Sequence, residues 1–110
     1  MKLALPINLN TVIECQADGK YLAHCLQLDL VAYGNSPETA ASELLEVIDI
    51  QFRTCLQNDN VSHFYHPAPQ EAWARLGTLL IDPSSITSES TRTVSTSAAT
   101  YDIRQFCYYA

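Results

Sequence analysis

Several acidic side chains in this 110-residue chain are of a type that could support catalysis. Two-metal hydrolysis needs several carboxylates that converge on a pair of ions about 4 Å apart. The candidates are Glu14, Asp29, Glu46 and Asp49. Glu46 and Asp49 are three residues apart on the polar face of a predicted helix, where solvated acids are common. No sequence feature brings the four together, so we expect no metal site, and a metal-dependent nuclease is only the third hypothesis for function.

Histidine and cysteine form two further patterns with chemical potential. His63 and His66 have the HxxH spacing of a zinc site on a helix, but Pro67 follows directly and makes a helix unfavourable. His24 precedes Cys25, yet neighbours on a strand point to opposite faces and cannot form a dyad. The four cysteines form no CxxC motif, which favours free thiols. We therefore expect no enzyme activity and no cofactor.

Aromatic residues are concentrated in the second half of the chain and suggest binding rather than catalysis. Aromatic side chains are enriched in the buried centres of protein interfaces. They could equally complete the hydrophobic core of the monomer, and both interpretations stay open. The predicted partner-binding residues are Phe64, Tyr65, Trp73, Phe106, Tyr108 and Tyr109.

The net charge restricts the class of partner. Twelve acidic and six basic residues give a formal charge of −6 and a pI near 4.7. Such a chain repels phosphate backbones and anionic membranes, so we expect basic proteins as partners rather than nucleic acids or membranes. The apolar run near the N-terminus is short and broken by Pro6, and it predicts no signal peptide. We expect a cytoplasmic protein.

The first third of the chain has the pattern of three strands, over residues 11–17, 20–26 and 28–33. Asp18-Gly19 separates the first two, which predicts a β-hairpin with a two-residue turn. These elements must carry Glu14, His24 and Asp29. The order of strands and helix predicts an α+β fold with a curved antiparallel sheet packed against one main helix.

A helix over residues 37–57 is predicted from its first turn and its periodicity. Ser36 suits the N-cap, Pro37 the first helical position and Glu38 the positive end of the helix dipole. Apolar residues recur at intervals of three and four and form one buried stripe. These residues are Ala41, Leu44, Leu45, Ile48, Phe52 and Cys55.

The remaining residues complete a single domain, 1–110, whose core is expected in 7–58. Residues 59–83 are irregular, with a short helix within 69–80 that turns Trp73 and Leu76 inward. Eleven of the seventeen residues in 84–100 are Ser or Thr, which is typical of an exposed loop. Residues 101–110 form a C-terminal strand that must join a sheet edge, either its own or that of another copy. We expect a homo-oligomer.

The junction from strand to helix resembles a known family. Gly34-Asn35-Ser36-Pro37-Glu38-Thr39-Ala40 is similar to the G-[DN]-[ST]-x-E-x-A junction of HicB-like proteins, and the wider match covers residues 10–57. In this junction Gly34 would free the backbone, Ser36 would cap the helix and Ala40 would let the helix approach the sheet. The resemblance implies a β-β-β-α-β order and a partial ribonuclease H-like fold.

The same resemblance implies a function. HicB-like proteins act as type II antitoxins of toxin-antitoxin systems, which bind and neutralise a small basic RNA-cleaving toxin. Residues 59–110 carry no helix-turn-helix or ribbon-helix-helix pattern, so we expect no operator binding. The alternative is an orphan protein of the same fold that associates with itself and has no toxin partner.

Overall fold

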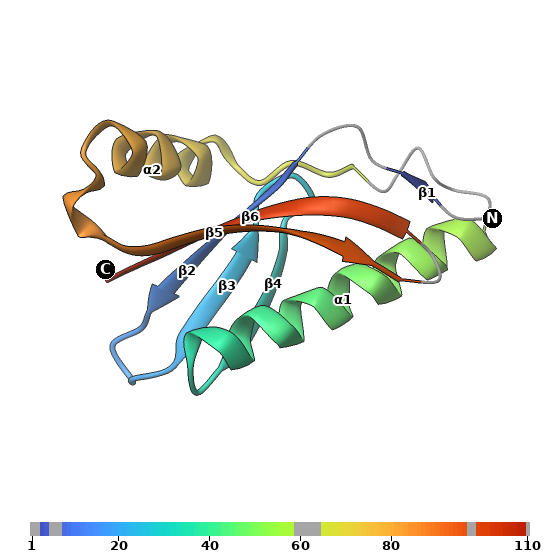
Figure 1. Ribbon diagram of the computed structural model, residues 1–110, viewed down its shortest axis with the longest axis horizontal. Helices are drawn as coiled ribbons and strands as arrows, with labels where there is room; N and C mark the ends of the chain where they lie inside the picture. Colours follow the sequence, from blue (N-terminus) through green and yellow to red (C-terminus); the bar gives the residue numbers. More distant parts are fainter. Residues whose placement is uncertain (1–2, 5–7, 59–64, 97–98, 110) are drawn as a thin grey trace.

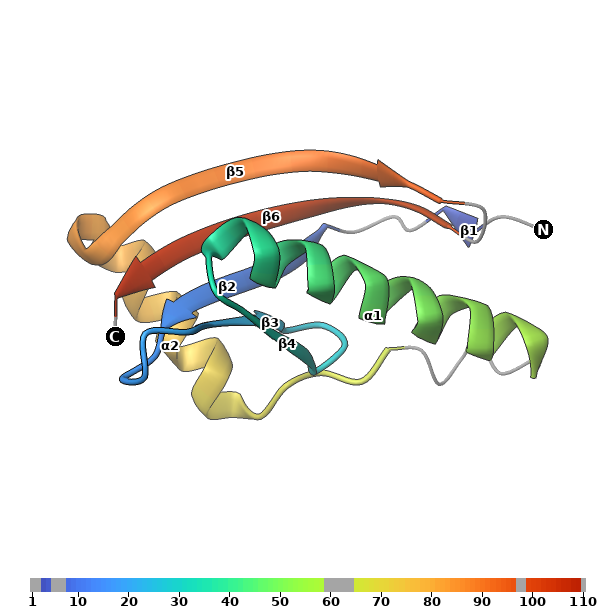
Figure 2. The ribbon, with the colours of Figure 1, turned by 90° about the horizontal axis from the view of Figure 1, so that it is seen from below.

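The computed structural model describes residues 3–4, 8–58, 65–96 and 99–109, which form a mixed sheet with a helix on each face (Figures 1 and 2). The sheet order is β1-β6-β2-β3-β4. β5 pairs with β6 on the side opposite β2. The predicted α+β class is confirmed. The elements are β1 (Leu3–Ala4), β2 (Leu9–Cys15), β3 (Tyr21–Cys25), β4 (Leu30–Gly34), α1 (Pro37–Gln57), α2 (Gln70–Ile81), the 3₁₀ turn η2 (Pro83–Ser85), β5 (Ile86–Ser95) and β6 (Ala99–Tyr109).

The predicted hairpin is present, but its turn is longer than two residues. β2 and β3 pair antiparallel up to Cys15 and Tyr21. Gln16 N then donates to Lys20 O at 2.7 Å, which leaves three residues between them. Of these three, only Gly19 has a positive φ, 85°. This pattern is that of a three-residue hairpin loop, in which one left-handed residue closes the turn.

The N-terminal cap of α1 forms as predicted, although the strand before it is shorter than predicted. β4 begins at Leu30 rather than at residue 28 because residues 26–29 form a turn that ends at Asp29, with a φ of 51°. α1 spans the predicted residues 37–57. Ser36 is its N-cap, accepting a hydrogen bond from Thr39 N at 3.1 Å, and Pro37 occupies the first turn.

Two hydrophobic clusters hold the helices against opposite faces of the sheet. The α1 side contains the larger cluster, in which Ile13, Leu44, Ile48, Phe52 and Tyr101 are among the buried residues. The predicted apolar stripe of the helix is thereby confirmed, with Leu45 only partly buried. The second cluster, on the α2 side, consists of Val12, Leu26, Ala68, Leu76, Leu79, Phe106 and Tyr108, with Trp73 packed against it.

The predicted antiparallel sheet is only partly correct. β2, β3 and β4 are antiparallel to one another, as are β5 and β6. β6, however, pairs parallel with β2, with Leu9 opposite Ile103 and Cys15 opposite Tyr109. Alternating apolar residues specify which face of a strand is buried but not the direction of its neighbour. The two helices between the strands provide the long connection that parallel pairing requires.

The prediction of a loop over residues 84–100 is wrong. Residues 86–95 form β5, a ten-residue strand paired with β6 along most of its length. β5 lies at the edge of the sheet and is exposed on most of its residues, so it needs hydrogen bonds to β6 rather than apolar residues. Its threonines are β-branched and suit an extended backbone. The C-terminal strand is confirmed as β6.

Candidate functional site

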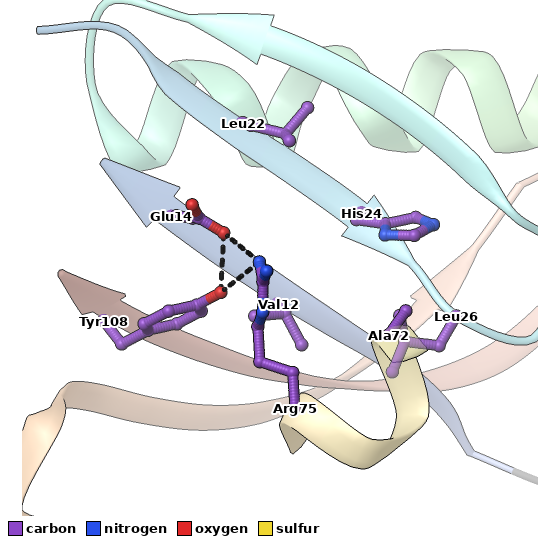
Figure 3. A pocket seen from close by; sticks show the side chains of 8 residues that line it. All are labelled: Val12, Glu14, Leu22, His24, Leu26, Ala72, Arg75 and Tyr108. Carbon is purple, nitrogen blue, oxygen red and sulfur yellow. Dashed lines mark hydrogen bonds and ion pairs between the residues drawn. The ribbon is translucent and has the colours of Figure 1, made fainter. Parts of the chain in front are cut away.

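Helix α2 is attached to the sheet by a hydrogen-bonded group of three side chains from three elements (Figure 3). Tyr108 OH on β6 donates to Glu14 Oε2 on β2 at 2.6 Å. Arg75 Nη1 on α2 lies 2.9 Å from the same Glu14 oxygen and 3.3 Å from Tyr108 OH. Burial and the hydrogen bond to Glu14 raise the pKa of Tyr108 to about 12. The hydrogen bond to Tyr108 and the nearby Glu14 carboxylate raise the pKa of Arg75.

A groove runs beside this group, between α2 and the sheet. A cavity of about 60 Å³ and an open groove of about 350 Å³ are both lined by His24, Ala72 and Arg75. His24 and Asp29 form one wall, where His24 Nε2 lies 2.7 Å from Asp29 Oδ1. Glu71 on α2 lies on the opposite wall. The region therefore contains three carboxylates, Glu14 included, and one guanidinium, which gives it an acidic character.

Beyond the groove the sheet is not covered by α2. The register places Leu22 opposite Tyr33 and His24 opposite Val31, so these four side chains share one face of β3 and β4. Tyr33 is 59% exposed and Val31 is 46% exposed. We call Leu22, His24, Val31 and Tyr33 the open sheet face. Large apolar side chains exposed next to each other in this way are typical of binding surfaces.

The predicted metal-site candidates are divided between the two sides of the sheet. Glu14 bonds Arg75 and Tyr108, and Asp29 bonds His24, all on the α2 side. Glu46 and Asp49 are on α1, which packs on the opposite face, and Asp49 pairs with Arg53 at 3.1 Å. No group of three or more His, Cys, Asp or Glu side chains that could hold a metal ion occurs within the described ranges.

The cysteine and histidine patterns do not form a nucleophilic site. Cys25 is buried under α1, whereas His24 next to it faces the groove, as expected for neighbours on a strand. Burial raises the pKa of the Cys25 thiol to about 12, so it stays protonated and weakly nucleophilic at neutral pH. Of the two histidines in the HxxH pattern, the structure describes His66 only, because His63 lies outside the described residues.

The six aromatic residues predicted to bind a partner have different positions. Phe106 and Tyr108 are buried beneath α2, so a partner cannot reach them in this structure. Trp73 packs against the same cluster, and Tyr65 is 53% exposed. Phe64 lies outside the described residues, as does the side chain of Tyr109. For Phe106 and Tyr108 the structure therefore corresponds to the core interpretation.

Comparison of the chain with protein-family models, curated proteins and solved structures finds no match. The HicB-like resemblance therefore stays a prediction, carried by the Gly34–Ala40 junction. Within the described ranges, no helix is long and apolar enough to cross a membrane.

The open sheet face was missed by the sequence analysis. Residues 28–33 are apolar at nearly every position, which gives no alternation to separate an exposed face from a buried one. The exposed positions, Val31 and Tyr33, are recognisable only once β4 is seen to be an edge strand beyond the reach of α2. The sequence did not indicate the role of Arg75, because its partners, Glu14 and Tyr108, are far away in the sequence.

Proposed function

We propose that this chain is a non-catalytic, cytoplasmic protein-binding module, of the HicB-like antitoxin type, whose open sheet face binds a small basic protein. The observation that carries the proposal is the exposure of Val31 and Tyr33 beside an acidic groove. An apolar centre flanked by charge is the usual composition of a protein interface. Exposed tyrosines of this kind often dominate the binding energy.

The charge distribution favours a basic partner. Glu14, Asp29 and Glu71 border the open sheet face, and the whole chain has a formal charge of −6. A positively charged protein would be steered towards this surface and would bring Lys or Arg side chains to the carboxylates. The small RNA-cleaving toxin implied by the HicB-like resemblance has this chemistry.

The strand at this edge offers a second mode of contact. β4 ends the sheet order and pairs with β3 alone among the described strands, so its outer backbone groups have no strand partner there. An extended segment of the basic partner can pair with β4 and place alternate side chains over Val31 and Tyr33. Binding would then combine backbone hydrogen bonds with an apolar contact.

Co-purification of the tagged chain from its native cells, followed by mass spectrometry, tests this function. The expected result is one small basic protein in stoichiometric amount. In binding assays with that protein, Tyr33→Ala should weaken affinity by about tenfold or more, as removal of an interface hot spot does. Ile50→Ala is the control, since Ile50 is similarly exposed but lies on α1, which packs on the opposite face of the sheet.

Two results would count against the proposal. Recovery of the chain without a basic partner would favour the alternative, an orphan self-associating protein. A partner whose affinity is unchanged by Tyr33→Ala would place the binding surface elsewhere on the molecule. Equal losses for Tyr33→Ala and Ile50→Ala would mean that the open sheet face has no special role.

A further inference from the structure

The second edge of the sheet is formed by β5, a long strand with no strand on its outer side. β5 is ten residues long and pairs with β6 alone among the strands that the structure describes. Eight of its ten residues are exposed, and seven of these lie in one unbroken stretch, residues 87–93. Figure 2 shows β5 as the outermost strand, extending over nearly the length of β6.

β5 lacks most of the features that keep edge strands from pairing. Proteins usually protect such edges with proline, charged side chains (above all lysine), short length or a bulge. β5 contains neither proline nor lysine, and its one irregularity lies at the first pair, between Ile86 and Ser88. Its threonines favour extended backbone. The central part, residues 88–94, is therefore a regular edge whose charged residues are Glu89 and Arg92.

The polar side chains of β5 do not block that edge. Glu89 pairs with Arg104 on β6, with Arg104 Nε 2.8 Å from Glu89 Oε1. Thr93 Oγ1 donates to Asp102 Oδ1 at 2.6 Å. Both side chains are thus directed across the sheet towards β6, and the outer backbone groups of β5 stay accessible to another strand.

We infer that β5 pairs antiparallel with β5 of a second copy of this chain, so that the two sheets join into one. Charge favours a second copy as the occupant of this edge. β5 carries one Glu and one Arg and is neutral, whereas the whole chain carries −6. Two copies that repel each other elsewhere can approach most closely along this neutral strand.

The positions of the two charges also restrict the register. Two-fold antiparallel pairing places one residue opposite itself, and opposite side chains share a face. With Ser90 or Thr91 at the centre, Glu89 faces a threonine of the second copy and Arg92 faces a serine. A centre at Glu89 or Arg92 would instead set like charges opposite each other, which is destabilising. We therefore place the two-fold axis at Ser90 or Thr91.

Sedimentation equilibrium tests the pairing. We expect a reversible monomer–dimer equilibrium with a dissociation constant in the micromolar range, as is usual for a small interface. Ser90→Lys sets two lysines opposite each other if the axis lies at Ser90, and sets lysine opposite Arg92 if it lies at Thr91, so it should weaken the dimer by about fivefold or more. Gln57→Lys changes the net charge equally at an exposed site on α1 and should leave the dimer unchanged. Circular dichroism checks that both variants are folded.

Disulfide cross-linking tests the register independently. Cα atoms directly opposite each other in an antiparallel pair lie within disulfide reach. Ser90→Cys or Thr91→Cys should form a covalent dimer on oxidation, whereas Gln57→Cys and the unaltered chain should not. A chain that stays monomeric at high concentration would overturn the inference, as would a dimer equally stable with Ser90→Lys and with Gln57→Lys. These outcomes do not depend on whether a basic partner exists.

Discussion

At Gly34, the space that a β-carbon would need is already occupied by the first turn of α1. A β-carbon built there would meet Ala40 N and lie 2.8 Å from the Thr39 carbonyl carbon. The φ of Gly34 is not positive, so the expectation that glycine frees the backbone here is wrong. The glycine is needed because strand and helix approach each other closely, and the fully buried Ala40 belongs to the same contact.

Gly34→Ala should therefore lower the free energy of unfolding by about 3 kcal/mol, the upper end of the usual cost of overpacking. Urea denaturation measures the change. Gly77→Ala is the control, because a β-carbon at that helical position meets nothing within 4 Å. That variant should raise stability by up to about 1 kcal/mol through helix propensity. Equal effects of the two substitutions would contradict the close-approach explanation.

At the scale of elements, the hydroxyl of Tyr108 links α2 to the sheet, whereas that of a second buried tyrosine, Tyr101, forms no such link. Tyr108 OH bonds Glu14 and Arg75, which connects β2, β6 and α2. Tyr101 packs on Phe52, and its hydroxyl has no hydrogen-bond partner among the described residues. Burial raises the pKa of Tyr101 to about 12, close to that of Tyr108. The two phenols thus differ in bonding but share their titration behaviour.

Tyr108→Phe should lower the free energy of unfolding by about 1 kcal/mol at neutral pH, because Glu14 and Arg75 lose a partner. Tyr101→Phe should leave it unchanged or raise it slightly, since an unsatisfied buried hydroxyl is removed. Urea unfolding of both variants measures the difference. A larger loss for Tyr101→Phe would show that its hydroxyl is bonded.

The raised pKa values also predict a loss of stability at high pH. Each folded phenol ionises near pH 12 and each unfolded one near pH 10, so the unfolded chain releases its protons first. The contribution is complete below pH 10 and is lost as the pH rises from 10 through 12. At about pH 11 each tyrosine should account for a loss of roughly 1 kcal/mol. Phenolate absorbance should rise in step with unfolding, and either Phe variant should reduce the loss.

At the scale of the whole molecule, the open sheet face and β5 lie at opposite edges of the sheet. A dimer formed through β5 would leave both open sheet faces accessible, so that one dimer could bind two basic partners. The two contacts differ in charge. The first unites two chains of −6 each, and the second unites an acidic surface with a basic one.

Salt should therefore act on the two contacts in opposite directions. Raising NaCl from about 0.05 M to about 0.5 M screens the repulsion between like-charged copies and should strengthen the dimer. The same change should slow association with a basic partner, because electrostatic steering is lost. Sedimentation and stopped-flow measurements on the same protein compare the two effects. Weakening of the dimer by salt would show that its interface depends on ion pairs.

Local signals in the sequence determined the elements that depend on neighbouring residues. Ser36 and Pro37 defined the start of α1, and the apolar period defined its buried face, since both act within one or two turns of a helix. Asp18-Gly19 marked the hairpin for the same reason, although the loop is longer than the dipeptide implies.

Tertiary structure alone decided which strands meet and which faces remain uncovered. The parallel pairing of β6 with β2 joins residues more than ninety positions apart, and periodicity carries no information about strand direction. β5 is a strand because β6 supplies its hydrogen bonds, not because its side chains need burial. The exposure of Tyr33 and the burial of Phe106 follow from the position of α2 over one half of the sheet, because burial depends on long-range packing.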